Sequence, residues 1–540
     1  QKTKMTYWTA LKLSFTNIKT KKGRTALTAF ASSIGIIGIA VVLALSTGFQ
    51  KQVNKTQTNT LAQMPITISQ TAQQQQTQSD KLKTAKASDK AVTAKVSAAD
   101  KATHANNLTK TYLNYIKDMS PSLSKNVTYT YSTGMNLLRQ VDGKTKSVSF
   151  SNQNTKSSTA TSMSSAMSSM SGVATSVYPM SQSGNASFLK KHYKVVSGHY
   201  PTTANEVVLI ANRDNTVNIN ALKNLGYSAK AGQNFKFGQI VGTTIKVVTN
   251  NDYYQKLPTG NYLPNKVTDS LYNKADNQTI KVVGVLRAKT KDSDNVLASG
   301  IAYSDKLTQN IIKINQNSDI VKAQKDSDTN VMTGAKVDDD TRDAVVSTLG
   351  GSTTPASILI YPNSFKNKDK VLSYLDKYNK GKSKADKVIY TDLAGTVSSL
   401  TGGLMDAITY VLIAFAGISL VTSMIMIAII TYTSVLERTK EIGILKALGA
   451  RKKDITRVFD AETTILGVAS GVLGVVIAWL LTFPINAVLS NVTGLNNVAH
   501  LNPVHGIVLI IISTVLTVLG GHIPARMAAK KDAATALRSE

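Results

Sequence analysis

Apolar positions along this chain are concentrated in four uncharged runs, and most of the remaining chain is polar. The runs cover residues 25–45, 407–436, 463–490 and 506–523, and they contain no Asp, Glu, Lys or Arg. A helix of about 20 apolar residues crosses the hydrocarbon core of a bilayer, so each run is long enough to span it. Buried helices of soluble proteins seldom extend this far without a charge. The pattern therefore predicts four membrane-spanning helices.

The first and second runs are separated by residues 49–403, whose pattern is typical of a water-exposed α+β domain. Two tracts of biased composition, 70–107 and 151–175, are interpreted as low-complexity insertions, and the core is expected at 193–390. Runs rich in β-branched residues predict strands, and periodic apolar positions predict helices. The predicted strands are 193–196, 206–211, 234–249, 280–286, 299–303 and 357–361, and the predicted helices are 216–226, 338–348 and 364–379.

Lys and Arg residues flank the four runs unevenly. Seven precede the first run, seven lie between the second and third, four follow the fourth, and none occurs in residues 490–505. Because basic flanks stay on the cytoplasmic side, both termini are expected in the cytoplasm and residues 49–403 outside a plasma membrane. A cleaved signal peptide explains residues 25–45 less well, since its apolar part spans only about 7–15 residues.

Composition narrows the possible chemistry. The chain has no cysteine and a formal charge of +30, of which residues 49–403 carry +20 because the parts before and after them carry +7 and +3. The lack of cysteine excludes disulfides, thiolate metal sites and cysteine nucleophiles. A Lys-coated outer domain suits an anionic envelope of the Gram-positive type. It also leaves open a second function, that of a membrane-anchored receptor or scaffold that binds anionic wall polymers.

No catalytic, cofactor-binding or metal-binding constellation is apparent. The Gly-Lys-Thr and Gly-Lys-Ser triplets at 143–145 and 381–383 lack the glycine that a phosphate-binding loop requires five residues earlier. His192 and His199 have no carboxylates nearby and are interpreted as surface histidines. We therefore expect no enzymatic activity from this chain, and nothing in it indicates nucleic acid binding.

The runs themselves are neutral at their centres, which disfavours a path for polar substrates across the bilayer. Gly467 with Gly471, and Gly35 with Gly38, permit close contact between helices, either within one subunit or between two. Residues 399–403, which include two glycines beside the second run, are interpreted as a flexible hinge.

Two polar segments next to the runs have helical patterns of their own. Trp8, Leu11, Phe15 and Ile18 recur on one face of residues 6–18, with lysines beside them, which predicts an interfacial helix on the inner leaflet.

Residues 437–460 predict a charged hairpin in which a short helix ends at Gly449 and a second helix leads into the third run. Such a hairpin is suited to transmit motion to a cytoplasmic partner. A tight loop with ordinary positive charge is the plainer alternative.

Three segments of the chain resemble segments of a known family of membrane proteins. Residues 437–455, ERTKEIGILKALGARKKDI, closely resemble the coupling loop of FtsX-like and MacB-like ABC transporter permeases. Residues 523–529 and 536–538 resemble that family's C-terminal cytoplasmic helix, although Ala533 stands where proline is more usual. The motif at 197–201 with residues 205–209 resembles its extracytoplasmic core domain. The resemblance assigns contact with an ATP-binding domain to Glu437, Arg438, Glu441, Ile442, Leu445, Lys446, Gly449 and Ala450, and the C-terminal helix to Pro524, Arg526, Leu537 and Arg538.

The resemblance implies a permease that works as a pair and relays ATP-driven motion to its outer domain, a mechanism called mechanotransmission. Its client would be an antimicrobial compound, peptide, lipoprotein or wall hydrolase of the cell envelope, handled with or without an accessory protein. ATP and Mg would bind a partner domain and not this chain. Because the chain begins with Gln1 and contains no ATPase motif, we expect that domain either fused upstream or on a separate polypeptide.

The predicted fold is a membrane α-helical protein with four spans per subunit and a large α+β domain inserted between the first two. Its parts are a cytoplasmic helix at 1–24, spans at 25–48, 404–436, 461–490 and 505–523, the outer domain at 49–403, the coupling loop at 437–460, an outer loop at 491–504 and a C-terminal helix at 524–540.

Overall fold

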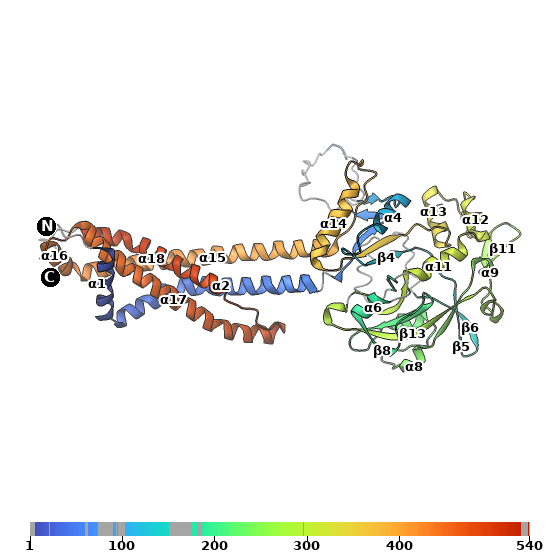
Figure 1. The fold of residues 1–540 in the computed structure, drawn as a ribbon, viewed down its shortest axis with the longest axis horizontal. Helices are drawn as coiled ribbons and strands as arrows, with labels where there is room; N and C mark the ends of the chain where they lie inside the picture. The colour runs from blue at the N-terminus through green and yellow to red at the C-terminus, as the bar shows by residue number, and fades with distance from the viewer. Residues whose placement is uncertain are drawn as a thin grey trace. The chain divides into compact units, whose positions relative to one another are not determined.

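The computed structural model describes residues 6–20, 22–59, 63–73, 90–92, 94, 103–150, 175–180, 186–294, 296–530 and 538. The chain divides into two compact units, residues 1–56 with 398–540, and residues 57–397 (Figure 1). Most of the two predicted insertions at 70–107 and 151–175 lies outside the described residues, and so does Leu537.

The first unit contains four helices long and apolar enough to cross a membrane, which confirms the predicted membrane fold. At about 1.5 Å per residue, α2 and α15 extend about 57 and 68 Å, roughly twice the thickness of the hydrocarbon core. Both therefore continue as helices beyond the bilayer. The helices of this unit are α1 (Tyr7–Thr20), α2 (Lys22–Asn59), α15 (Leu393–Glu437), α16 (Thr439–Ala447), α17 (Lys452–Thr493) and α18 (Pro503–Lys530).

Two expectations about these helices are wrong. Residues 399–403 lie inside α15, which runs unbroken from Leu393 to Glu437, so the expected hinge is helical. No separate C-terminal helix begins at 524, since α18 continues through Pro524 to Lys530. A proline inside a helix removes one backbone hydrogen bond, and the packed neighbours of α18 hold the helix together across that gap.

Glycines in α17 let its backbone approach α18. A Cβ at Gly467 would lie 2.7 Å from Cα of Thr514, and one at Gly471 would lie 2.9 Å from Cα of Ile510. The Ser513 hydroxyl uses this proximity to donate a 3.0 Å hydrogen bond to the Gly467 carbonyl. Close approach without side chains is how membrane helices gain dispersion contacts. The Gly467–Gly471 pair therefore packs within the subunit.

α2 and α15 lie side by side in the same unit, as Figure 1 shows. A Cβ at Gly35 would lie 2.4 Å from the Ser423 hydroxyl, and Ser46 shares a 3.0 Å hydrogen bond with Thr409. Gly38, by contrast, has no neighbour within 4 Å. Only one glycine of this second pair therefore serves a contact within the described chain.

The second unit is α+β, as predicted, and is built on two main sheets. The larger has the order β6-β5-β10-β13-β9-β14-β7 with β8 also paired to β13, and the smaller has the order β1-β15-β4. Two further pairs are β2-β3 and β11-β12. The strands are β1 (Ile66–Ser69), β2 (Thr71–Gln73), β3 (Thr103–Ala105), β4 (Asn126–Thr130), β5 (Leu137–Val141), β6 (Lys144–Val148), β7 (Ser176–Tyr178), β8 (Tyr193–Gly198), β9 (Glu206–Ala211), β10 (Thr244–Val247), β11 (Tyr254–Lys256), β12 (Tyr262–Pro264), β13 (Gln278–Ala288), β14 (Gly300–Ser304) and β15 (Ser357–Tyr361).

Helices cover both sheets of this unit. They are α4 (Lys110–Lys117), α6 (Ser187–His192), α7 (Ile219–Asn224), α8 (Phe237–Ile240), α9 (Asn250–Tyr253), α10 (Asp269–Tyr272), α11 (Asp305–Asn315), α12 (Asp319–Lys325), α13 (Asp339–Thr348) and α14 (Phe365–Asn379), with a 3₁₀ turn at Lys291–Ser293. The predicted strands and helices are found, except that 234–249 holds α8 as well as β10. The predicted core at 193–390 is too narrow, because β1, β4, β5, β6 and β7 precede it and belong to the two sheets.

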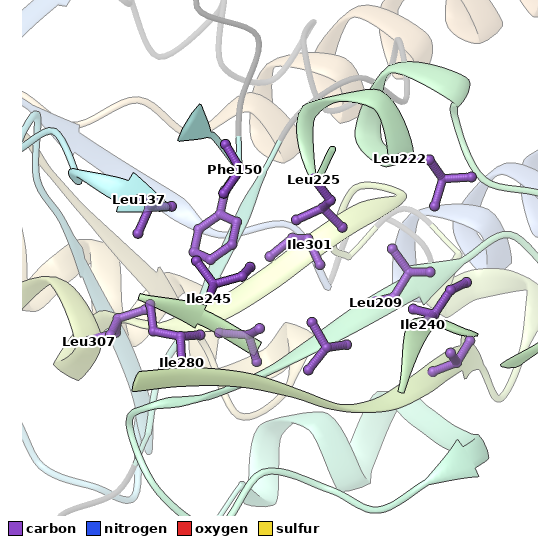
Figure 2. Close-up of a cluster of buried hydrophobic side chains, with 14 of the residues drawn as sticks. Leu137, Phe150, Leu209, Leu222, Leu225, Ile240, Ile245, Ile280, Ile301 and Leu307 are labelled. Carbon is purple, nitrogen blue, oxygen red and sulfur yellow. The ribbon is translucent and has the colours of Figure 1, made fainter. Parts of the chain in front are cut away.

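The larger sheet is buried on both faces, which explains its continuous apolar strands. Along β9, Val207 and Leu209 pack in one hydrophobic cluster while Val208 and Ile210 pack in another on the opposite face. Figure 2 shows the first cluster, where residues of β5, β9, β10, β13 and β14 meet side chains of α7 and α8. Strands covered on both sides lose the alternation of apolar and polar positions. His192, interpreted as a surface residue, is buried at the second cluster against Phe188.

The smaller sheet packs against α4 and α14. Ile66, Ile358 and Ile360 of the sheet contact Tyr112 of α4 and Val371 of α14 in one cluster. The three strands pair antiparallel, with Ile66 opposite Ile360. Strand and helix faces with this apolar spacing bury most of their large side chains, which stabilises the layer by the hydrophobic effect.

The Ser197–Pro201 motif fixes a close crossing of β8 and β13. Gly198 has a φ of +80°, and a Cβ there would lie 2.1 Å from the Val283 carbonyl oxygen. The His199 N–H donates a 3.0 Å hydrogen bond to that oxygen, so the contact cannot widen without losing it. The motif is therefore a structural requirement of the larger sheet.

We predict that Gly198→Ala lowers the free energy of unfolding by about 3 kcal/mol, because left-handed strain adds to a clash with backbone. Gly232→Ala is the matched control, since Gly232 has a φ of +78° and nothing within 4 Å of an added Cβ. It should cost about 1 kcal/mol. Denaturant unfolding of the full chain measures both, and equal losses would contradict the proposed clash.

Asp305 joins the two sheets. Its carboxylate accepts hydrogen bonds from the N–H of Tyr129 at the open edge of β4, at 3.4 Å, and from the N–H of Met180, at 3.5 Å. Burial raises the pKa of Asp305 to about 6, because these long hydrogen bonds replace only part of the lost hydration.

We predict that Asp305 makes the second unit less stable as the pH rises through 6. The native state holds the proton more tightly than the unfolded chain, so this stabilisation is complete below about pH 4 and is lost above about pH 6. Two pKa units correspond to about 3 kcal/mol. Denaturant unfolding of the chain and of Asp305→Asn across this range measures the effect. Burial lowers the pKa of His192 to about 4 and gives an opposite slope in both proteins, so only their difference reports on Asp305. Parallel pH profiles would contradict the prediction.

Candidate coupling site

The hairpin between α15 and α17 begins with a bend at Arg438. This residue has φ −102° and ψ 15°, outside the helical values of its neighbours. The hydrogen bonds nevertheless continue across it, from Arg438 N–H to Ser434 O and from Ile442 N–H to Arg438 O, both at 3.1 Å. The Thr439 hydroxyl adds a 2.8 Å bond to Leu436 O. α16 is therefore a firm extension of α15 in a new direction.

The Arg438 side chain links three elements of the hairpin. Its Nε donates to Glu441 of α16 at 2.9 Å, and its Nη1 donates to Glu462 of α17 at 2.8 Å. The guanidinium also lies over the Phe459 ring, 5.5 Å from its centroid. The side chain is only 13% exposed. Planar, multiply bonded arginines of this kind hold geometry more tightly than single surface ion pairs do.

Gly449 ends α16. It has a φ of +93°, and its N–H donates to Lys446 O while the Ala450 N–H donates to Leu445 O, both at 3.0 Å. This pair of bonds is the Schellman motif, which requires the left-handed conformation that glycine adopts without strain. The interpretation of Gly449 as a helix stop is confirmed.

The next helix, α17, begins with a cap at Arg451, two residues after Gly449. The Asp454 carboxylate accepts a 3.1 Å bond from the Arg451 N–H and pairs with the Arg451 guanidinium at 3.2 Å. A carboxylate in the first turn of a helix also interacts favourably with the helix dipole. With Gly449 and Arg451 fixing both ends, the connection between α16 and α17 is tight.

The structure separates an inner and an outer face of α16. Ile442 is 2% exposed and packs against Ile455 and Phe459 of α17, so it is not available to a partner, contrary to the sequence prediction. Ile444 and Leu448 are instead 48% and 80% exposed. Of the other predicted contact residues, Leu445, Lys446 and Ala450 are half-buried, and Glu437, Glu441 and Gly449 are exposed.

Sequence reasoning missed the outer pair because two apolar stripes run along this short helix. Ile442 and Leu445 are three residues apart, and Ile444 and Leu448 are four apart, so each pair forms a face. Periodicity alone does not tell which face is inside. The apolar end of α18 distinguishes the two faces, because it covers the face that contains Ile442 and not the face that contains Ile444 and Leu448.

The last turns of α18 complete the hairpin's core. Ala525, Ala528 and Ala529 are buried in the same cluster as Ile442 and Phe459. Pro524 is also buried, whereas Arg526 and Arg538 are exposed, and Leu537 lies outside the described residues. The alanines allow α18 to approach closely, so three long helices meet at α16.

α1 lies against the start of α17. The Ser14 hydroxyl donates to Val458 O at 2.9 Å, and the Tyr7 hydroxyl shares a 2.9 Å hydrogen bond with Thr464. On the face predicted for the membrane, Trp8 and Phe15 are exposed while Leu11 and Ile18 are half-buried. Ala10 and Ser14 are thus buried against the bundle, whereas Trp8 and Phe15 are exposed.

Among the residues that the structure describes, no three or more His, Asp or Glu side chains gather in a way that could hold a metal ion. The hairpin's carboxylates, Glu441 and Glu462, bond to arginine instead. The described site therefore offers packing and charge for a protein contact.

A family model matches the part of the chain that contains this hairpin. Residues 413–533 match the family described as FtsX-like permease C-terminal. An uncharacterized ABC transporter permease of Methanocaldococcus jannaschii is 37% identical over 148 residues, which are 27% of this chain and 36% of the relative. The macrolide export ATP-binding/permease protein MacB of a Shewanella species is 37% identical over 132 residues, 24% of this chain and 19% of the relative. The chain thus spans about a third or less of the length of these curated relatives.

We predict that Arg438→Gln destabilises the first unit by about 2–3 kcal/mol, because it leaves the Glu462 carboxylate, only 20% exposed, without its partner, whereas Glu441 at 59% exposure stays hydrated. Thermal unfolding in detergent micelles measures the loss. The double variant Arg438→Gln with Glu462→Gln should recover a large part of it. Lys440→Gln, at an exposed position of the same helix, is the control and should change stability little. A single variant as stable as this control would show that the arginine does not hold the hairpin.

Proposed function

Since this chain is an FtsX/MacB-like ABC transporter permease, we propose that its α15–α16–α17 hairpin docks an ATP-binding domain and passes that domain's motion to residues 49–403. The family implies an ATP-binding partner. The four apolar helices make the chain a multi-pass membrane protein. The proposal adds the place of contact and the route of the motion.

The observation that carries the proposal is the outer face of α16. Ile444 and Leu448 expose apolar side chains one turn apart, next to the exposed charged residues Glu437, Lys440 and Glu441. An apolar anchor surrounded by polar groups is the usual composition of a protein–protein hot spot. On a short helix with both ends fixed, such an anchor is presented to a partner with little loss of conformational entropy.

Rigid connections explain how a push on α16 would travel. α16 is bonded to α15 and α17 through Arg438 and packs on α18 through Ile442. α15 then continues as one helix of 45 residues from Glu437 back to Leu393. A displacement at the hairpin would therefore shift the whole of α15. The uncharged centres of the spans agree with a relay of motion in which no polar substrate crosses the bundle.

The proposal places both termini and the hairpin in the cytoplasm, because Lys and Arg gather there, and residues 49–403 outside the cell. ATP and Mg would be bound by the partner domain, fused or separate. A second copy of the permease would provide the second half of the transporter. The outer unit would act on an envelope client, by export, extraction or regulation.

The absence of cysteine allows a direct test. With one cysteine in place of Leu448 and a photo-crosslinker attached to it in native membranes, we expect capture of a polypeptide that mass spectrometry identifies as an ABC ATP-binding domain. The anchor is expected to touch that domain because it is the most exposed apolar side chain of the hairpin.

Leu404→Cys is the matched control. It is 66% exposed on α15, near the opposite end of the same span, and should capture no ATP-binding domain. If the Leu448 probe is attached and captures no such domain, or if both positions capture it equally, the hairpin is not the docking element.

A further inference from the structure

A cavity of about 120 Å³ lies behind the coupling hairpin, in the first unit. It opens between the end of α1, the start of α2, the end of α15 and the first turns of α17. A volume of this size holds several water molecules or a small polar group. The lining residues that matter here are Ile18 and Thr20 of α1, Ile430 and Ser434 of α15, Arg438, Glu441 and Glu462.

The described part of the lining has more acidic than basic groups. Arg438 is its single cation, and it faces the two carboxylates of Glu441 and Glu462. In both ion pairs the bonded atom is Oε2, at 2.9 and 2.8 Å. One guanidinium thus serves two carboxylates, which favours a guest with a positive charge and N–H donors.

The surroundings of the cavity place it at the bilayer surface, close to lysines, and with apolar side chains in its lining. α1 carries exposed Trp8 and Phe15 and leads within two residues into the apolar helix α2, so the junction belongs at the surface of the bilayer. Lys19 and Lys22 are exposed at this junction. The apolar side chains of Ile18 and Ile430 stand beside the polar ones in the lining.

A guest with a primary ammonium, a phosphate next to it and an acyl chain would match the carboxylates, the lysines and the apolar side chains in turn. We propose that this cavity binds the headgroup of an aminophospholipid such as phosphatidylethanolamine, with its ammonium donating to Glu462 and Glu441 and its phosphate towards the lysines of the α1–α2 junction. The same two carboxylates hold Arg438, so the lipid would contact the residues that fix the hairpin. The site goes beyond docking of the ATP-binding domain and does not depend on it.

The full chain, released from bilayers with equal amounts of phosphatidylethanolamine, phosphatidylcholine and phosphatidylglycerol, would be studied by native mass spectrometry. We expect one phosphatidylethanolamine retained per chain, at least about tenfold in preference to the other two, since a charge-assisted hydrogen bond to an ammonium is lost with a quaternary amine. Because no ATP-binding domain is present, the result is independent of the coupling experiment.

Three variants locate the site. Glu462→Gln should lose the preference, and Ser434→Phe should lose it by filling the cavity while the Arg438–Glu462 ion pair remains. Asp406→Asn removes the same charge at an exposed position near the other end of α15 and should keep it. Unfolding midpoints show whether each variant is folded, and Ser434→Phe decides the matter if Glu462→Gln is not.

Three outcomes would overturn the proposal. The first is retention of phosphatidylcholine as strong as that of phosphatidylethanolamine, and the second is unchanged retention in a folded Ser434→Phe. The third is full displacement of the lipid by soluble phosphoethanolamine at equal concentration, which would show that the cavity takes a water-soluble amine and not a membrane lipid.

Discussion

The arrangement of the coupling hairpin depends on one buried cation. Arg438 lies where α15 bends into α16, and its two carboxylate partners belong to α16 and α17. A guanidinium with this little exposure is stable only while both partners stay in place, because an unpaired charge there would be costly. The bend, the angle of α16 and the position of its outer apolar pair are therefore set together. The cap at Gly449 and the buried alanines of α18 further restrict the conformations that the hairpin can adopt.

The spans meet through small residues, for a related reason. In lipid, apolar side chains gain little by packing on one another, so close backbone approach and hydrogen bonds between helices supply the cohesion. Gly467 and Gly471 bring α17 onto α18, and the Ser32 and Ser470 hydroxyls share a 2.5 Å hydrogen bond between α2 and α17. These contacts are internal to one chain. They make a bundle whose helices have little freedom to slide independently.

The sequence predicted those features that depend on local pattern. The four spans, the helix stop at Gly449 and most strands after residue 193 follow from hydrophobic runs and turn chemistry, and the structure contains them. Features that depend on distant neighbours were missed. β1 and β4 are short, and only their pairing with β15 makes a sheet of them. The inner face of α16 is chosen by alanines more than 80 residues later, and the expected hinge at 399–403 lies inside the unbroken helix α15.

A stiff hairpin and long continuous helices limit what this molecule can do with a mechanical input. If α16 could bend at Gly443 or swing freely at Gly449, a push from a partner would be absorbed locally. Instead Gly443 is buried inside the helix, and the Gly449 turn is held by backbone hydrogen bonds from the Gly449 and Ala450 N–H groups. Work applied at Leu448 must then move α15, α17 and α18 together or break the Arg438 contacts. A lipid headgroup seated on the same carboxylates would strengthen the first outcome, because it would add partners to charges that otherwise share one arginine. Composition of the membrane would in this way tune how completely motion is passed along the helices.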